Sequence, residues 1–170
     1  YLKAFNGERQ IYVFSCVDQD EALDDLGIKR IKIDEDILTV KYEMKDFQDS
    51  CMVFDDIDII ADNKIKAVVQ NIRGQALEIG RHSNITVCAT SHQIMNYTAT
   101  RTLLNESTTV TFFPQCGGSY QSTQFLTKYC GLKDKPIKKI LSLPSRWVTI
   151  SKTYPMYVMF EQGVVMMGSI

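Results

Sequence analysis

Residues 51–56 decide the fold: they read CMVFDD, four apolar residues followed directly by the carboxylates Asp55 and Asp56. Continuous apolar runs are typical of strands that are covered on both faces of a sheet. In open parallel sheets, ligands bind at the carboxyl ends of the strands. Charges placed there are desolvated, which is unfavourable unless a cation or hydrogen bonds compensate. The run therefore predicts a buried strand that ends in a ligand-binding acidic pair, with a solvated acidic turn of Asp55, Asp56 and Asp58 as the alternative.

Strand-like and helix-like segments alternate on both sides of this run. Between residues 62 and 80, apolar residues recur at the i, i+3, i+4, i+7 spacing of an amphipathic helix. This alternation predicts an α/β fold, a mostly parallel sheet flanked by helices that ends in a C-terminal antiparallel hairpin. Further helices are expected at residues 20–26, 98–106, 119–130 and from 134, and strands at 11–15, 31–33, 85–90, 109–113, 147–150, 156–160 and 164–167.

Length and charge limit the possible classes of protein. A chain of 170 residues with 45% apolar residues fits one globular domain, and a net charge of −1 indicates no particular partner. Residues 1–62 hold sixteen acidic and seven basic residues, whereas residues 63–170 hold four acidic and twelve basic ones. The second half is therefore a candidate polyanion-binding surface, unless the charges of the two halves interleave on folding. Lys135, Lys138 and Lys139 are candidate nucleic-acid contacts, with a solvated helix face as the alternative.

The cysteines and the uncharged stretches indicate the compartment. Five widely spaced cysteines without a CxxC pair favour a reducing, intracellular environment with neither a disulfide framework nor a zinc cluster. Residues 82–100 and 107–127 lack charges, but their polar residues make them unsuited to crossing a bilayer. No signal peptide is recognisable at the start of the sequence. We therefore expect no membrane insertion.

The acidic pair has the chemistry of a Walker B element. In that element, the first acid, here Asp55, holds Mg²⁺ through water, and the second, here Asp56, polarises the attacking water. Thr90 and Ser91 follow the next apolar run and are candidates to bind a phosphate or its water, although an ordinary strand-to-loop junction is the alternative. Arg81, expected at the same sheet edge, is a candidate to reach the nucleotide of a neighbouring subunit; otherwise it complements a helix dipole. His82 and His92 flank one strand, and we do not expect them to bind a metal together.

Several segments resemble, in order and over nearly the whole chain, the genome-packaging ATPases of large DNA viruses. They are VFDDID (53–58), EIGRH (78–82), NITVCATSH (84–92), TRTLLNES (100–107), TFFP (111–114), YCGL (129–132) and SRWVTISKTYPMYVMFEQG (145–163). These ATPases belong to the FtsK/HerA branch of P-loop motor ATPases. The resemblance implies a RecA-like P-loop NTPase core that uses ATP and Mg²⁺ to translocate double-stranded viral DNA into a capsid. It also implies a homo-oligomeric, hexameric ring, capsid or portal partners, and a location at the viral assembly site in the host cytoplasm or in the virion.

The resemblance also assigns roles to individual residues. Asp55 matches the magnesium-linked acid and Asp56 the catalytic acid. Ser91 falls at the sensor position, where cellular relatives usually have glutamine. Arg81 falls where the branch commonly carries an arginine directed at the adjacent subunit's nucleotide.

One departure from the family concerns the phosphate-binding loop. None of the nine glycines belongs to a GxxxxGK[ST] motif, whose backbone N–H groups and lysine cradle phosphates. Residues 1–170 therefore look like a single ATPase domain without its P-loop strand, its Walker A loop and most of its first helix, and we expect this chain alone to be inactive. A non-catalytic remnant or interaction module with the same fold is the alternative. A weaker one is a metal-dependent nuclease built on Asp55, Asp56 and Asp58.

Overall fold

The computed structural model describes residues 7–92, 97–115 and 119–167. The chain forms two compact units, Tyr1–Gln93 and Ile94–Ile170. Unit 1 holds a four-stranded parallel sheet and unit 2 a four-stranded antiparallel sheet, so the expected α/β class is confirmed. The single ATPase domain over residues 1–170 and its RecA-like character stay predictions.

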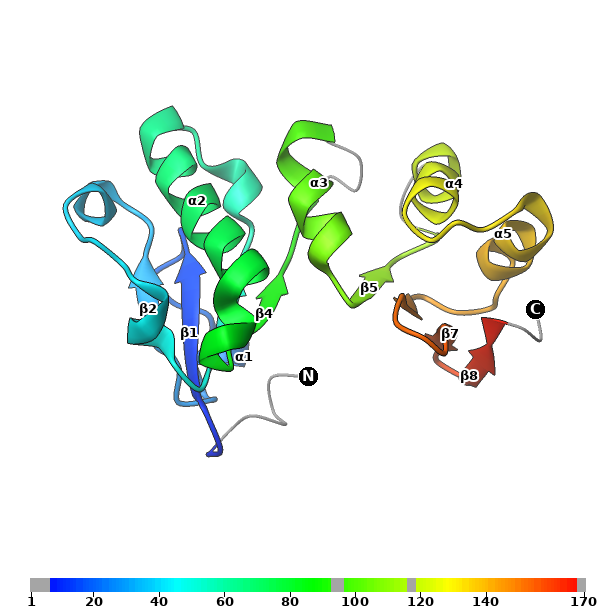
Figure 1. The fold of residues 1–170 in the computed structure, drawn as a ribbon, viewed down its shortest axis with the longest axis horizontal. Helices are drawn as coiled ribbons and strands as arrows, with labels where there is room; N and C mark the ends of the chain where they lie inside the picture. Colours follow the sequence, from blue (N-terminus) through cyan, green and yellow to red (C-terminus); the bar gives the residue numbers. More distant parts are fainter. Residues whose placement is uncertain (1–6, 93–96, 116–118, 168–170) are drawn as a thin grey trace. The chain divides into compact units, whose positions relative to one another are not determined.

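The sheet of unit 1 has the strand order β2-β1-β3-β4 (Figure 1). Its four strands run parallel, as expected for strands joined by helical or looped crossovers. They are β1 (Gln10–Ser15), β2 (Lys29–Lys32), β3 (Ser50–Phe54) and β4 (Thr86–Ala89). Every residue of β3 is buried, as the continuous apolar run predicts.

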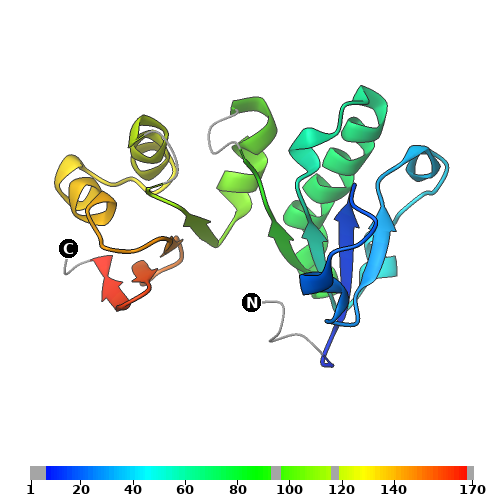
Figure 2. The same cartoon turned by 180° about the vertical axis from the view of Figure 1, so that it is seen from behind.

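Side chains of unit 1 alternate between two apolar layers, one on each face of the sheet. Phe14, Met52 and Phe54 pack with Val69 and Ile72 of helix α2 (Asn63–Ile79). The opposite face buries Ile11, Val13, Cys51 and Val53, against which Leu23 of the short helix α1 (Glu21–Asp24) packs. Figure 2 shows α1 on the face of the sheet opposite α2. The described residues of this unit also include the short 3₁₀ helices η2 (Glu35–Leu38), η3 (Met44–Phe47), η4 (Ile57–Ile59) and η5 (Gly80–Ser83).

Helix α2 begins at an aspartate cap. The Asp62 carboxylate accepts hydrogen bonds from the backbone N–H groups of Lys64, at 2.7 Å, and Ile65, at 3.0 Å. These bonds satisfy donors that the first turn of a helix leaves unpaired. They also lower the pKa of Asp62, since they favour its charged form.

Replacing this cap is expected to destabilise unit 1 in a pH-dependent way. Asp62→Ala lowers the thermal midpoint at pH 7, whereas Asp62→Ser, which keeps an acceptor, loses less. Because the pKa of Asp62 is lower in the folded than in the unfolded state, its contribution is fully present above about pH 4 and disappears as the pH falls through the folded value. Thermal unfolding of both variants from pH 7 to pH 2 measures this. A wild-type advantage over Asp62→Ala that persists at pH 2 would contradict it.

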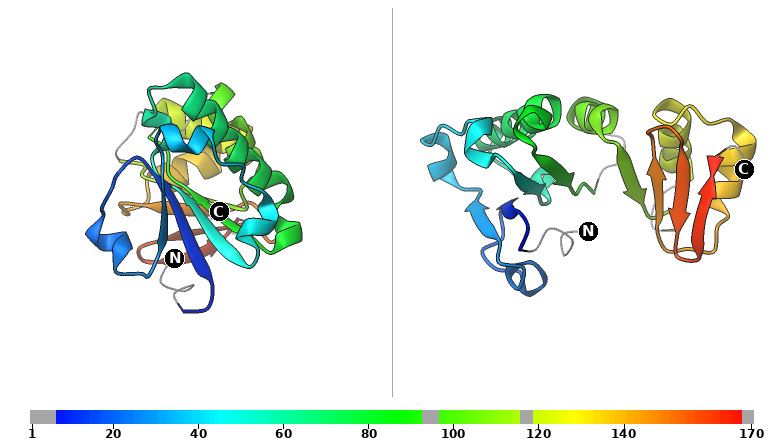
Figure 3. Two further views of the ribbon diagram at one scale, coloured as in Figure 1. Left: turned by 90° about the vertical axis from the view of Figure 1, so that its left-hand side faces the viewer. Right: turned by 60° about the horizontal axis from the view of Figure 1, so that its bottom comes forward.

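Unit 2 packs helices on one face of an antiparallel sheet with the order β5-β6-β7-β8 (Figure 3). Helices α4 and α5 contribute Phe125, Leu126 and Ile140 to a core that also contains Val148 and Ile150. Lys152 donates to the Leu104 carbonyl at the end of α3. The elements are α3 (Tyr97–Glu106), β5 (Thr109–Phe112), α4 (Ser119–Lys128), α5 (Asp134–Leu141), β6 (Val148–Ser151), β7 (Tyr157–Phe160) and β8 (Gly163–Met166).

The prediction of a mostly parallel sheet is wrong for β5. This strand pairs antiparallel with β6, so the antiparallel part is a complete four-stranded sheet rather than a terminal hairpin. Within β5, Thr109 and Thr111 are exposed whereas Phe112 is buried, the alternation typical of a sheet covered on one face. The expected hairpin of β7 and β8, joined by Glu161 and Gln162, is confirmed.

The described cysteines are Cys16, Cys51, Cys88 and Cys130, and each is a free thiol. Burial is the main cause that raises the pKa of Cys51 to about 11. Among the described residues, no helix combines the length and the apolar character that a membrane span requires.

Candidate functional site

The register of the parallel sheet brings three polar residues together at its carboxyl edge. Phe54 pairs with Phe14 of β1 on one side and with Ala89 of β4 on the other. The residues that directly follow these three paired positions are all polar: Ser15, Asp55 and Thr90. Two further ladder bonds hold this row, since the Asp55 N–H donates to the Phe14 carbonyl at 2.9 Å and the Thr90 N–H to the Phe54 carbonyl at 3.0 Å.

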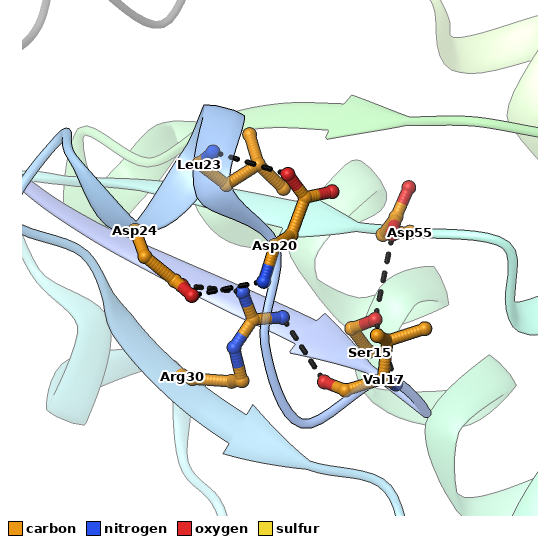
Figure 4. Close-up of polar contacts among 7 residues, drawn as sticks. All are labelled: Ser15, Val17, Asp20, Leu23, Asp24, Arg30 and Asp55. Carbon is orange, nitrogen blue, oxygen red and sulfur yellow. Dashed lines mark hydrogen bonds and ion pairs between the residues drawn. The ribbon is translucent and has the colours of Figure 1, made fainter.

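Hydroxyl groups lie on both sides of the Asp55 carboxylate. Ser15 Oγ donates to Asp55 Oδ2 at 3.4 Å (Figure 4), and Thr90 Oγ1 lies 3.2 Å from Asp55 Oδ1. Ser15 is buried, and Asp55 is half-buried. Because each carboxylate oxygen accepts more than one hydrogen bond, the carboxylate is oriented by the protein while keeping acceptor capacity for a further ligand.

Asp56 lies where the chain turns sharply out of β3. Its backbone is in the left-handed region, with φ 47° and ψ 36°, which aspartate tolerates better than most residues. The Asp56 N–H donates to Thr90 Oγ1 at 2.8 Å, and the same hydroxyl lies 3.0 Å from Asp56 Oδ1. His92 Nε2 lies 3.1 Å from the other oxygen, Oδ2. Both oxygens of Asp56 therefore contact residues that follow β4.

The third carboxylate, Asp58, has a different role. Ser91 Oγ donates to Asp58 Oδ2, and Lys66 Nζ of α2 donates to the Asp58 carbonyl at 2.9 Å. The buried Arg73 of α2 also interacts electrostatically with Asp58: burial lowers the pKa of Arg73, and the negative charge of Asp58 opposes this effect. These contacts hold the turn after Asp56 against α2. Asp58 takes part through both its carboxylate and its backbone carbonyl.

The donor set fits Mg²⁺ better than a metal held mainly by protein ligands. No group of three or more His, Cys, Asp or Glu side chains suited to hold a metal ion occurs in residues 7–92, 97–115 and 119–167. Magnesium usually takes one or two carboxylates and completes its octahedron with water and substrate phosphates. Asp55, oriented by two hydroxyls, fits that requirement. The nuclease alternative built on Asp55, Asp56 and Asp58 stays a prediction.

The loop after β1 borders the same edge and is tied down by an ion pair. Arg30 of β2 contacts Asp24 at 2.6 Å and donates to the Val17 carbonyl at 3.2 Å, as Figure 4 shows. The hydrogen bond from Arg30 is the main cause that lowers the pKa of Asp24. The Val17 N–H in turn donates to Ser15 Oγ at 3.2 Å. Ser15 was not identified as a site residue from the sequence. Its position at the end of the apolar run 11–14 could have indicated it, because that run forms a strand beside β3.

The predicted site residues are not all at this edge. Asp55, Asp56 and Thr90 are brought together, and Ser91 lies beside them but bonds Asp58. The expectation that Arg81 shares their edge is wrong. Helix α2 runs back across the sheet, so Arg81, in η5 before β4, lies at the amino edge, where the Asp49 N–H before β3 donates to the neighbouring Ser83 carbonyl at 3.0 Å. A role of Arg81 towards an adjacent subunit stays a prediction.

The candidate nucleic-acid contacts lie in unit 2. Lys135, Lys138 and Lys139 are exposed on α5, whereas Ile137 and Ile140 of the same helix are buried. The helix is therefore amphipathic, with a basic solvent face. This arrangement fits both a nucleic-acid surface and a solvated helix face.

Comparison with known proteins shows that the chain is similar in sequence to a viral protein. It is 40% identical over 165 residues to the uncharacterized protein V3 of Sputnik virophage. The match covers 96% of this chain and 66% of the virophage protein, slightly less than two thirds of its length. No model of a known protein family matches the chain. No solved structure matches it. The chain is thus similar, over almost its whole length, to a protein of a virophage.

Proposed function

We propose that the full-length protein is an ATP-driven motor that translocates double-stranded viral DNA into a capsid during genome packaging. The observation that carries the proposal is the row of Ser15, Asp55 and Thr90 with the adjoining Asp56 at the carboxyl edge of a parallel sheet. This is the edge at which open α/β sheets bind ligands. Similarity to an uncharacterized virophage protein fits a viral protein. The assignment to a packaging motor draws on the ordered resemblance to packaging ATPases.

In the proposed reaction, the residues of this chain orient a metal and a water. Bound Mg²⁺ supplies positive charge that offsets the charge developing on the transferred phosphoryl group. Asp55, oriented by Ser15 and Thr90, would hold this ion. Asp56 accepts a hydrogen bond from the attacking water and thereby orients it. Preorganised groups of this kind lower the barrier because they are already in place when the reaction begins.

The remaining parts of the proposal concern the full-length protein. The chain contains no GxxxxGK[ST] motif, so a phosphate-binding loop and the rest of a RecA-like core would belong to segments outside it. A homo-oligomeric, hexameric ring would let Arg81 approach the nucleotide of the adjacent subunit. Capsid or portal components would be partners, at a viral assembly site in the host cytoplasm or in the virion.

DNA stimulation of ATP hydrolysis tests the proposal. We expect the full-length protein to hydrolyse ATP faster when double-stranded DNA is present. Replacing Lys135, Lys138 and Lys139 with glutamine should raise the DNA concentration for half-maximal stimulation and reduce the salt slope by up to about 3, since each phosphate contact contributes about one unit.

A matched control uses three exposed lysines of unit 1, Lys29, Lys41 and Lys45. Their triple replacement with glutamine changes the net charge equally but should leave the salt slope near that of the wild type. Hydrolysis without any response to DNA would contradict translocation, and an equal effect of both triple variants would contradict a role for α5.

The absence of a GxxxxGK[ST] motif favours a second candidate, a non-catalytic module with the same fold. Binding of a nucleotide to the full-length protein separates the two functions. A motor binds Mg²⁺ and ATP together, whereas a module of this kind binds neither and still folds.

A further inference from the structure

His92 contacts the proposed catalytic acid but has no role in the function proposed above. It follows β4 by three residues, and its Nε2 lies 3.1 Å from Asp56 Oδ2. The sequence directs attention to Ser91 instead, whose Oγ donates to Asp58. We propose that His92, together with Thr90, positions Asp56 for hydrolysis, an inference that rests on the proposed function.

Two residues contact the two oxygens of the Asp56 carboxylate. Thr90 Oγ1 lies 3.0 Å from Oδ1, and His92 Nε2 lies 3.1 Å from Oδ2. One contact would leave the carboxylate free to rotate about the bond to its Cβ. When the Thr90 hydroxyl donates to Oδ1, two hydrogen bonds on different oxygens fix the plane of the group. The hydrogen bond from the Asp56 N–H to Thr90 Oγ1 holds the Asp56 backbone whichever carboxylate the hydroxyl donates to.

The direction of the second hydrogen bond follows from the chemistry of the pair. An ionised carboxylate can only accept, so Nε2 of His92 must carry a proton and donate the hydrogen bond. The Nε2-protonated neutral ring and the imidazolium both provide this donor. Thr90 has a single hydroxyl proton for Asp55 and Asp56, at 3.2 and 3.0 Å. When Thr90 donates to Asp55, His92 is the side chain that still orients Asp56.

The exposed position of His92 allows the residue to be replaced without disturbing the core. Its side chain is 71% exposed, so removing the ring leaves no cavity in the core. A glutamine at this position keeps an N–H donor at a similar reach, whereas alanine has none. The second histidine of the chain, His82, lies in η5 at the opposite edge of the sheet and is also exposed. His82→Ala is therefore a matched control.

The kinetic test compares these variants in DNA-stimulated ATP hydrolysis by the full-length protein. We expect His92→Ala to lower kcat about 10- to 100-fold with little change in the KM for ATP, since misplacing a reacting group slows the chemical step. His92→Gln should recover a large part of kcat, and His82→Ala should behave as the wild type. If Asp56→Asn abolishes hydrolysis but His92→Ala retains the wild-type kcat, the positioning role is overturned while the proposed function stands.

A second readout needs no catalysis. Asp56→Asn should shift the imidazole resonances of His92 in NMR spectra of the full-length protein and leave those of His82 in place. An unshifted His92 signal overturns the contact and therefore the inference, whatever the kinetics show. A protein that shows this shift but hydrolyses no ATP overturns the proposed function and, with it, the catalytic purpose of the contact.

Discussion

Asp56→Asn is expected to lower the kcat of DNA-stimulated ATP hydrolysis by about 10²- to 10⁴-fold, the range by which positioned acid–base groups accelerate reactions. The substitution removes the negative charge that polarises the attacking water but keeps nearly the same size and shape. The backbone N–H of residue 56 still donates to Thr90 Oγ1, so the turn after β3 should persist. The loss should therefore appear in kcat, with the thermal midpoint close to that of the wild type.

A steady-state assay of phosphate release, run beside a thermal unfolding curve, measures both quantities. Asp25→Asn is the matched control, since Asp25 is an exposed aspartate of unit 1 that directly follows α1. It should leave both quantities unchanged. Wild-type turnover in Asp56→Asn would show that another group activates the water, and the assignment of Asp56 would be wrong.

Phe54→Ala is expected to destabilise unit 1 by about 3–5 kcal/mol, the range found for truncation of buried aromatic residues. Phe54 is fully buried and stacks on Phe14 of β1, with ring centroids 4.8 Å apart. The substitution removes the ring from the centre of the layer between the sheet and α2. Because the Phe54 carbonyl accepts from the Thr90 N–H and Asp55 follows directly, the site should lose its order with the core.

Chemical denaturation measures the free energy of unfolding of this variant. Two controls bracket it: Phe54→Leu, which refills part of the space, and Ile59→Ala, which truncates an apolar side chain that is 60% exposed. We expect an intermediate loss for Phe54→Leu and less than about 0.5 kcal/mol for Ile59→Ala. A loss below about 1 kcal/mol for Phe54→Ala would mean that this layer does not hold the sheet together.

The parts of the fold with strong local patterns could be predicted from the sequence. The apolar run before Asp55 gave a fully buried strand, and the spacing of apolar residues gave α2 almost to its ends. The meeting of Asp55 with Thr90 followed from a general rule, because parallel strands bring their carboxyl ends to one edge. These features depend on periodicity and strand direction, both of which the sequence carries.

The remaining features depend on contacts between distant segments. The antiparallel pairing of β5 with β6 is formed across two intervening helices, and alternation of segments alone could not distinguish it from a parallel strand. Ser15 becomes a site residue only because β1 lies beside β3 in register. Ser91 bonds Asp58 and His92 contacts Asp56 because the chain turns at Asp56 into a left-handed conformation. The sequence alone did not reveal which carboxylate Ser91 and His92 would each contact.

The central claim is that the carboxyl edge of the parallel sheet binds a divalent cation with a nucleotide. Manganese prefers the same oxygen ligands as magnesium, and its unpaired electrons broaden nearby NMR signals. The direct measurement is the broadening of backbone amide signals of the full-length protein by Mn²⁺ in the presence of a non-hydrolysable ATP analogue. The account predicts selective loss of the signals of Ser15, Asp55 and Thr90, with those of Arg9 and Asn84 at the amino edge retained, and no selective loss in Asp55→Asn. Equal broadening at both edges, or retained signals at Asp55, would contradict it.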